Sequence, residues 1–223
     1  MFCLSGKKKS TDVKFAVAVI GLSLRVSAQA TVYGGVEFPG GSSSFSDAVV
    51  SYDPTYGGTS GPLVQYQTPT NALGIPTGSS DTGFVTLGQG GRIVLKFTDN
   101  SLTGSGTSAF DLWVFEVGPD VEDTFVDISK DGNTWFSVGK VFGATAGIDI
   151  DNFGFGTSDF FSYVRLTDDA MEGQRGSGGS VGADIDAVGA ISSAPPVHDV
   201  PEPVSLALVG LSLVGLGITR RRT

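Results

Sequence analysis

Short runs in which apolar and polar residues alternate, separated by glycine-rich turns, dominate the sequence between residues 31 and 198. A period of two is the spacing at which successive side chains point to opposite faces of a β-strand. Val, Ile, Phe, Tyr and Trp together number 44 in this region, and these residue types suit a pleated, half-buried surface. The same region has no sustained helical period of apolar residues. The pattern therefore predicts an all-β fold.

Six segments show the strand pattern most clearly. In residues 92–97, Ile93, Leu95 and Phe97 share one face of the predicted strand, and two basic residues lie on the other. Residues 111–117 are more uniformly apolar, which predicts a central strand that is buried on both faces. Strands spaced about ten residues apart, with turns between them, are typical of an antiparallel β-sandwich or barrel. The other predicted strands are residues 125–129, 134–141, 160–166 and 183–191.

Charge is distributed unevenly along the chain. The formal net charge of all 223 residues is −9, but residues 31–198 contain 20 acidic and 6 basic residues, a net charge of −14. The other eight basic residues lie within the first 30 or the last 25 positions. A folded region that binds nucleic acid needs Lys and Arg on its surface to contact phosphates. The distribution therefore excludes nucleic acid as a partner.

Cysteine and histidine occur once each, as Cys3 and His198. A single cysteine excludes an intrachain disulfide and a cysteine-based zinc site. A Ser-His-Asp hydrolase needs a histidine base inside its folded domain. His198 instead follows Pro195-Pro196, in a segment that we interpret as a linker spanning residues 192–199.

The first 30 residues have the organisation of a secretory signal peptide. Lysines at positions 7, 8, 9 and 14 form a positive amino-terminal part, and residues 15–24 form a short apolar run. Ala28-Gln29-Ala30 then supplies the small-x-small pattern at which signal peptidase cleaves. We predict that signal peptidase removes residues 1–30 and that the β-sandwich domain spans residues 31–191. The alternative is a short amphipathic or membrane helix.

The last 24 residues combine three features in a fixed order. Pro201-Glu202-Pro203 precedes an apolar run at residues 204–218, which is followed by Arg220, Arg221 and Arg222. The run is shorter than the roughly 20 apolar residues that span a bilayer, and its cationic end should stay on the cytoplasmic side. These physical features alone predict a marginal membrane helix within residues 200–223.

This three-part arrangement resembles the PEP-CTERM sorting signal of Gram-negative bacteria. The resemblance implies that an exosortase-type membrane protease recognises and processes the carboxyl-terminal segment. It also implies export to the cell surface or into an extracellular polysaccharide matrix, with transient anchoring of the chain by its carboxyl-terminal helix. A plain tail anchor is the alternative.

Residues 129–135, with the sequence Ser-Lys-Asp-Gly-Asn-Thr-Trp, predict a β-hairpin because Asp-Gly readily adopts the positive φ angles of a tight turn. The segment is similar to the Asp-box hairpin of sialidase-type propellers, with one residue fewer between Asp and Gly. It is also similar to hairpins of discoidin-like and other galactose-binding-type jelly rolls. With Val85-Thr86-Leu87-Gly88 and residues 182–188, it gives residues 82–191 a resemblance to extracellular jelly-roll modules, which implies a jelly-roll-like sandwich. A plainer interpretation is a stable turn with Trp135 packed in the core.

Several aspartates lie close together in the last third of the folded region. Residues two apart in a strand point to the same side, so each Asp-x-Asp pair presents two carboxylates together. Carboxylates this close repel one another unless a cation neutralises them, and hard oxygen ligands suit Ca²⁺. We expect the glycine-rich segment at 173–182 to add backbone carbonyls. The alternative is solvated carboxylates in turns. The expected Ca²⁺ ligands are Asp184 and Asp186, followed by Asp168, Asp149 and Asp151.

The leading hypothesis for function is a non-enzymatic, exported surface protein that binds extracellular polysaccharide, with no catalytic residues. Tyr52, Tyr56 and Tyr66 lie in a Gly- and Pro-rich region, where they could stack on sugar rings or simply attach that region to the sandwich. The second hypothesis is a structural or adhesive surface protein that binds no small ligand.

The third hypothesis is a hydrolase that acts on polysaccharide. Asp111 and Glu116 flank Trp113, and two carboxylates beside an aromatic ring can form a glycosidase site. A spacing of five places the two acids on opposite faces of a regular strand, however. A buried ion pair between Glu116 and Arg165 is therefore the more usual interpretation.

Overall fold

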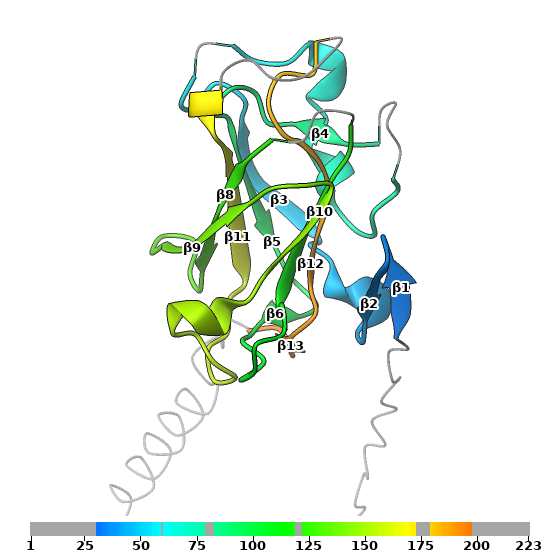
Figure 1. Ribbon diagram of the computed structural model, residues 1–223, viewed down its shortest axis with the longest axis vertical. Helices are drawn as coiled ribbons and strands as arrows, with labels where there is room; N and C mark the ends of the chain where they lie inside the picture. The colour runs from blue at the N-terminus through cyan, green and yellow to red at the C-terminus, as the bar shows by residue number, and fades with distance from the viewer. Residues whose placement is uncertain (1–29, 59, 79–82, 119–121, 173–178, 198–223) are drawn as a thin grey trace, which may run out of the picture.

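The computed structural model describes residues 30–58, 60–78, 83–118, 122–172 and 179–197. Regular structure in this part of the chain is almost entirely antiparallel β-sheet, and its helical elements are short 3-10 turns. Figure 1 shows two main sheets that face each other, with the hairpin of β1 and β2 at one side. The predicted all-β fold is therefore confirmed, and its sheets pack as a sandwich.

The larger sheet has five antiparallel strands in the spatial order β3, β5, β11, β8 and β9. Val164 in its central strand lies between Leu95 and Ile128 of the neighbouring strands, and all three side chains are buried. The strands span Ala48–Asp53 (β3), Arg92–Lys96 (β5), Tyr163–Asp168 (β11), Thr124–Ser129 (β8) and Phe136–Val141 (β9).

The smaller sheet has four strands in the order β10, β7, β12 and β4, and two short strand pairs stand beside the main sheets. The four strands span Thr145–Ile148 (β10), Leu112–Glu116 (β7), Asp184–Ala190 (β12) and Val85–Thr86 (β4). The two pairs are Thr31–Tyr33 (β1) with Val36–Phe38 (β2), and Ser101–Leu102 (β6) with Ser193–Ala194 (β13). The 3-10 turns are Gly41–Ser44 (η1), Val64–Tyr66 (η2), Pro69–Ala72 (η3), Ile150–Phe153 (η4) and Ala170–Glu172 (η5).

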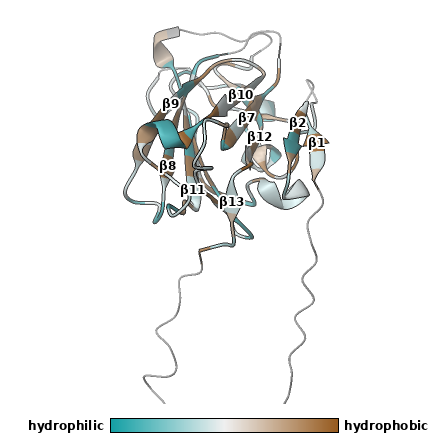
Figure 2. Ribbon diagram, turned by 60° about the horizontal axis from the view of Figure 1, so that its bottom comes forward, coloured by the Kyte–Doolittle hydropathy of each residue, from teal (hydrophilic) through white to brown (hydrophobic). Residues whose placement is uncertain are grey.

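The main hydrophobic core lies between the two sheets. Ile93 and Leu95 of the larger sheet and Leu112 and Val188 of the smaller sheet are fully buried in one cluster. Burying an aliphatic side chain of this size stabilises a fold by about 1.5–3 kcal/mol. Figure 2 shows the apolar residues concentrated along the strands of the two sheets. The alternation in the sequence therefore sets which side of each strand is inside.

A second apolar cluster covers the outer face of the smaller sheet. Phe38, Phe45, Phe115 and Ala187 form it, and the rings of Phe38 and Phe45 lie 4.7 Å apart between their centroids. Strand β2 and the residue that follows η1 supply the two rings from outside the sheet. Strand β7 consequently has neighbours on both faces, which confirms the prediction for residues 111–117.

The predicted hairpin joins β8 to β9. Gly132 has a φ of 76°, which is the left-handed conformation that the turn requires. Oδ1 of Asp131 accepts hydrogen bonds from the backbone N–H groups of Asn133 and Thr134, both at 2.8 Å. The expectation that Trp135 packs in the core is wrong, because its half-buried ring lies under the guanidinium of Arg165 instead. Local hydrogen bonds and the conformation of Gly132 determine the hairpin turn. The position of the Trp135 ring depends instead on Arg165 in the distant strand β11.

All six predicted strands are present, with ends shifted by up to three residues, but β3, β10 and the short strands β1, β2, β4, β6 and β13 were not predicted. In β3 the register shifts between Val49 and Ser51, and this irregularity breaks the alternation that identifies a strand. Strand β10 contains Ala146 and Gly147, which have low strand propensity. Pairing with β7, about 30 residues earlier in the sequence, is what makes it a strand.

Among the residues that the structure describes, no helix is long and apolar enough to cross a membrane. Residues 1–29 of the predicted signal peptide, His198 and the whole predicted sorting signal at 200–223 lie outside the described residues. The export signals therefore stay predictions from the sequence.

Candidate functional site

A pocket of about 370 Å³ lies on the larger sheet, next to the β8–β9 hairpin. Three adjacent strands and two loops form it, so its walls come from segments that are far apart in the sequence. Its polar and aromatic lining residues are Ser51, Asp53, Tyr56, Arg92, Trp135 and Arg165.

Two pairs of aromatic and guanidinium groups dominate this pocket. The guanidinium carbon of Arg92 lies 3.6 Å from the centre of the Tyr56 ring, and that of Arg165 lies 4.3 Å from the Trp135 ring. These distances are typical of cation–π contacts. The pocket therefore presents flat apolar surfaces directly beside charged hydrogen-bond donors.

Strand pairing holds the two arginines in place. Arg92 lies opposite Thr167 in the register of β5 and β11, and its Nε donates a hydrogen bond to the Thr167 hydroxyl at 2.9 Å. Arg165 lies opposite Asp127 on β8, and its Nε donates to Oδ2 of Asp127 at 3.0 Å. The alternation along β5 and β11 directs both side chains away from the core.

All five basic residues that the structure describes in the domain belong to the larger sheet or its hairpin. Lys130 pairs with Asp159, Lys140 pairs with Asp123 and Asp169, and Arg165 pairs with Asp127. Within the described part of the chain, no carboxylate forms an ion pair with Arg92 or Lys96. The described basic residues of this acidic domain therefore gather on the sheet that carries the pocket, and Arg92 and Lys96 are the two that form no ion pair with a described residue.

The structure separates the three tyrosines that were predicted to contact glycan. Tyr56 lines the pocket with 55% of its surface exposed. The Tyr52 hydroxyl donates a hydrogen bond to the carbonyl oxygen of Thr86 at 2.5 Å, and burial followed by the charge of Asp184 raises the pKa of Tyr52. The Tyr66 ring stacks on Phe84 with 5.6 Å between centroids. Only the first of the three is available to a ligand at this pocket.

A second pocket, of about 400 Å³, lies where β7 ends, and Glu116, Thr77 and Asp186 are among its lining residues. Burial, followed by the neighbouring carboxyl group of Glu122, raises the pKa of Glu116 to about 9. The prediction that Glu116 pairs with Arg165 is wrong, because Oε1 of Glu116 accepts the backbone N–H of Glu122 at 3.1 Å. This pocket therefore holds a neutral carboxyl group at neutral pH.

The aspartates predicted to bind Ca²⁺ fall into two groups. Asp149 and Asp151 lie with Asp111 in a set whose ligand oxygens are all within 4.8 Å of one another. Asp111 was not among the predicted ligands, and a signal for it could not come from local spacing, since it lies 38 residues before Asp149. The site that the structure suggests for a metal is therefore different from the one that the sequence placed first.

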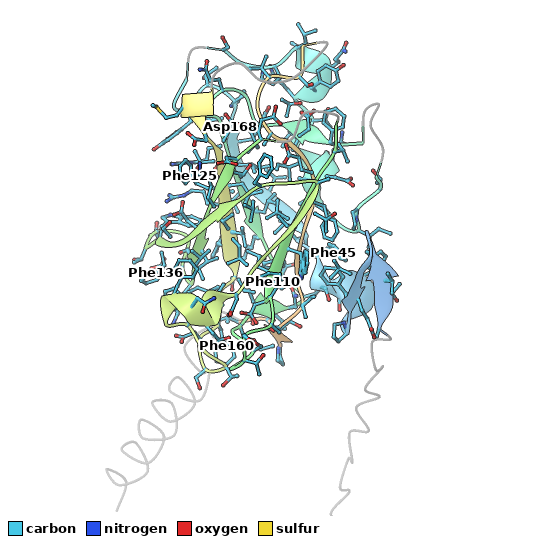
Figure 3. The ribbon with its side chains drawn as sticks, viewed as in Figure 1. Phe45, Phe110, Phe125, Phe136, Phe160 and Asp168 are labelled. Carbon is cyan, nitrogen blue, oxygen red and sulfur yellow. The ribbon has the colours of Figure 1, made fainter. Side chains whose placement is uncertain are left out.

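Asp168, Asp184 and Asp186 lie elsewhere, and each has hydrogen-bond partners of its own. Both oxygens of Asp168 accept backbone N–H groups, from Gly90 at 2.8 Å and from Ala183 at 2.9 Å. Oδ1 of Asp184 accepts the hydroxyl of Thr86. Figure 3 shows Asp168 toward the opposite end of the sandwich from Phe110, the residue that precedes Asp111. These three carboxylates therefore hold loops and strands together through hydrogen bonds.

The carboxylate of Asp186 has different hydrogen-bond partners from that of Asp184, although only one residue separates the two. Its oxygens accept hydrogen bonds from the backbone and hydroxyl of Thr77, at 3.1 and 2.9 Å, and from the backbone of Gly78 at 2.8 Å. The register of β12 against β7 shifts between Ile185 and Ala187, so the simple alternation fails at this point. The carboxylates of Asp184 and Asp186 were expected to point to the same side of the strand, and the structure does not show this.

The pair of acids in the hydrolase hypothesis is not brought together. Asp111 precedes β7 and Glu116 ends it, so they are about 16 Å apart along an extended strand. The two carboxyl groups of a glycosidase site lie about 5–9.5 Å apart. These two residues therefore do not form such a site.

No family model matches the sequence, and no curated protein matches it. Among solved structures, the chain is similar to the C-terminal domain of a chitobiase from Bacteroides fragilis. The likeness covers 70% of this chain and 97% of that one, with 14% sequence identity and a TM-score of 0.38.

Proposed function

We propose that this chain is an exported, non-enzymatic surface protein whose jelly-roll-like sandwich binds carbohydrate in the pocket on the larger sheet. The observation that carries the proposal is the pairing of Tyr56 with Arg92 and of Trp135 with Arg165 at one pocket. A sugar ring has apolar C–H groups on its faces and hydroxyl groups around its edge. Aromatic faces beside charged hydrogen-bond donors complement both parts of such a ring.

The pocket is held ready for a ligand. Trp135 directly follows a hairpin turn that is fixed by Asp131 and Gly132, and Arg165 is oriented by Asp127. A site that is ordered before binding loses less conformational entropy when its ligand arrives. Its volume is also within the range of small-molecule sites, about 300–1,000 Å³.

Two arginines and one aspartate, Asp53, line the pocket, and this excess of positive charge favours acidic sugars. Arg92 has no ion-pair partner among the described residues, and Lys96 lies on the same strand face four residues later. A guanidinium group binds a carboxylate through two parallel hydrogen bonds. We therefore expect uronic acid residues to bind more tightly than the corresponding neutral sugars. An extracellular polysaccharide with such residues is the proposed partner.

Binding of polysaccharides to the full-length protein tests this function. A glycan array finds candidates, and titration calorimetry then compares a polyuronate with its neutral counterpart. Trp135→Ala and Tyr56→Ala should each weaken binding about tenfold or more, because each removes a stacking surface. Phe142→Ala is the matched control, since Phe142 is 61% exposed and does not line the pocket.

Three results would contradict the proposal. If no glycan binds, the structural or adhesive hypothesis replaces it. If Phe142→Ala weakens binding as much as Trp135→Ala, glycan contacts the protein outside this pocket. Turnover of a polysaccharide by the full-length protein would instead favour a hydrolase.

We also propose that the two ends of the chain direct its export from a Gram-negative bacterium. Signal peptidase would remove residues 1–30, and an exosortase-type protease would act at the sorting signal that begins with Pro201-Glu202-Pro203. One observation supports the first step: β1 begins at Thr31, so removal of residues 1–30 leaves every described strand intact.

Mass spectrometry of the protein expressed with and without an exosortase tests both steps. We expect a mature amino terminus at Thr31 and a lower mass only where the exosortase is present. Glu202→Ala should prevent the second change, and Glu37→Ala, in strand β2, should not. An unchanged mass in the presence of the exosortase would contradict the sorting proposal.

A further inference from the structure

Three aspartates from two distant parts of the sequence meet at one end of the smaller sheet. Asp111 directly precedes β7, Asp149 precedes η4, and Asp151 lies in the first turn of η4. Each offers a carboxylate oxygen within 4.8 Å of the other two. Pairing of β10 with β7 brings them together, since Ile148 lies opposite Leu112 in that register.

Asp111 is the unusual member of this group. Its side chain is completely buried, and its Oδ2 accepts the backbone N–H of Ile150 at 2.9 Å. Its Oδ1 is buried as well and has no hydrogen-bond partner among the described residues. Burial raises the pKa of Asp111, although the hydroxyls of Ser192 and Ser105 act in the opposite direction, and neither hydroxyl forms a hydrogen bond to Oδ1. A buried carboxylate oxygen without a donor is costly, so this atom needs another electropositive partner.

The other two carboxylates are held in place by backbone groups. Oδ2 of Asp151 accepts the backbone N–H of Ser105 at 2.9 Å and that of Gly106 at 3.0 Å. Oδ1 of Asp149 accepts the backbone N–H of Asp151 at 3.0 Å, as the cap of η4. The oxygens are therefore fixed in position by backbone groups of two separate segments, η4 and the loop that precedes β7.

No basic side chain in the described part of the chain compensates the charge of this group. The described lysines and arginines of the domain belong to the larger sheet or its hairpin, and none forms an ion pair with Asp111, Asp149 or Asp151. Three carboxylates this close repel one another strongly in a partly buried place. A bound cation would remove that repulsion and supply a partner for Oδ1 of Asp111.

We propose that Asp111, Asp149 and Asp151 bind one divalent cation, and that this cation is Ca²⁺. The donors are all oxygen atoms, which excludes a preference for the softer metals that bind to sulfur or imidazole. Ca²⁺ accepts six to eight oxygens in irregular arrangements, whereas Mg²⁺ needs a nearly ideal octahedron and retains several waters. Three fixed carboxylates from two separate segments match the less regular geometry. Backbone carbonyls and water would complete the coordination.

Metal binding and thermal unfolding of the full-length protein test this site. After treatment with a chelator, 1 mM CaCl₂ should raise the Tm by about 5 °C or more if the protein binds Ca²⁺ with a Kd of 10 µM or lower. MgCl₂ at the same concentration should raise it less. Tb³⁺, which takes Ca²⁺ sites, should show luminescence sensitised by Trp113, two residues from Asp111, and Ca²⁺ should compete it away.

Variants locate the effect on these residues. Asp111→Asn and Asp149→Asn should abolish the Ca²⁺-dependent rise in Tm and the Tb³⁺ signal. In the absence of metal, both should melt no lower than the wild-type protein, because each removes one repelling charge. Asp168→Asn is the matched control: Asp168 is also buried but lies apart from the group, so the Ca²⁺ response should persist.

Three outcomes would overturn the proposal. One is a wild-type protein whose Tm and Tb³⁺ luminescence do not respond to the metals. Another is an Asp149→Asn variant with an unchanged Ca²⁺ response. The third is loss of the response in Asp168→Asn, which would place the ion elsewhere. If Asp111→Asn fails to fold, the wild-type and Asp149→Asn measurements decide the question. None of these results depends on glycan binding.

Discussion

The backbone N–H of Glu122 donates to Oε1 of Glu116 at 3.1 Å, and both carboxyl groups are buried at the end of β7. Burial and the second carboxyl group together raise the pKa of Glu116 to about 9. Two carboxyl groups this close in a buried place repel each other when both are ionised, which favours the protonated form of one of them. The domain therefore keeps a protonated glutamate at neutral pH.

This pair predicts how stability depends on pH. The folded state keeps the Glu116 proton up to about pH 9, whereas the unfolded chain releases it near pH 4.5. The contribution of Glu116 to stability is therefore complete below pH 4.5 and is lost as the pH rises toward 9. Glu116→Gln should gain about 1.4 kcal/mol relative to wild type for each pH unit in this window. Urea denaturation of both proteins from pH 5 to pH 9 measures the difference. A difference that stays constant with pH would show that Glu116 is ionised in the folded protein.

Tyr52 and Tyr66 should respond differently to loss of their hydroxyl groups. Tyr52→Phe removes the donor to the Thr86 carbonyl and should lower the free energy of unfolding by about 1–2 kcal/mol. Tyr66→Phe keeps the stacking on Phe84 and should change stability by much less. Chemical denaturation compares the two, and both variants should bind glycan as the wild-type protein does. Weaker glycan binding by Tyr52→Phe at unchanged stability would place Tyr52 in the site.

Gly189 marks where the aromatic cluster presses on the smaller sheet. A Cβ at this position would lie 2.7 Å from Cε1 of Phe38 and 2.8 Å from Cε1 of Phe45. Gly189→Ala should therefore destabilise the fold by about 1–3 kcal/mol through overpacking. Gly156→Ala is the control, because the nearest atom to its Cβ would be 3.8 Å away. Equal denaturation midpoints for both variants would mean that the amino-terminal segment moves aside at little cost.

Arg92 should determine the preference for acidic sugars. Arg92→Gln keeps a hydrogen-bond donor near Tyr56 but removes the charge, so affinity for a polyuronate should fall about tenfold. Affinity for the neutral counterpart should change much less. Lys130→Gln is the control, since Lys130 pairs with Asp159 and does not line the pocket. Calorimetry at two salt concentrations measures the affinity of each variant for the polyuronate and for the neutral glycan. An equal loss of affinity for the two glycans in Arg92→Gln would contradict a role of Arg92 in the preference for acidic sugars.

The sequence predicted the strands better than it predicted the sites. Residues 92–97 and 124–129 show alternation that survives in the fold, because the side-chain period belongs to each strand alone. The hairpin at Asp131-Gly132 was equally predictable, since its turn is fixed by local hydrogen bonds. Strand β3 escaped prediction because a register shift interrupts its pattern.

The candidate sites depend on contacts between distant residues. Among the predicted glycan contacts, Tyr56 lines the pocket, where its ring packs against the guanidinium of Arg92 from β5. Asp149 and Asp151 acquire Asp111 as a third partner through the pairing of β10 with β7. Alternation alone placed Asp184 and Asp186 together, and a register shift in β12 separates their partners. None of these outcomes is visible in a local spacing.

The sequence by itself determined the all-β class, the inward face of residues 92–97, the tight hairpin and the acidic character of the domain. Each of these follows from residue types and from spacings of a few positions. The tertiary structure alone decided which charges and rings meet: Arg92 with Tyr56, Glu116 with Glu122, and Asp111 with Asp149 and Asp151. The physical reason is that strand order and register in a sandwich arise from packing the whole core, and a single segment does not contain that information.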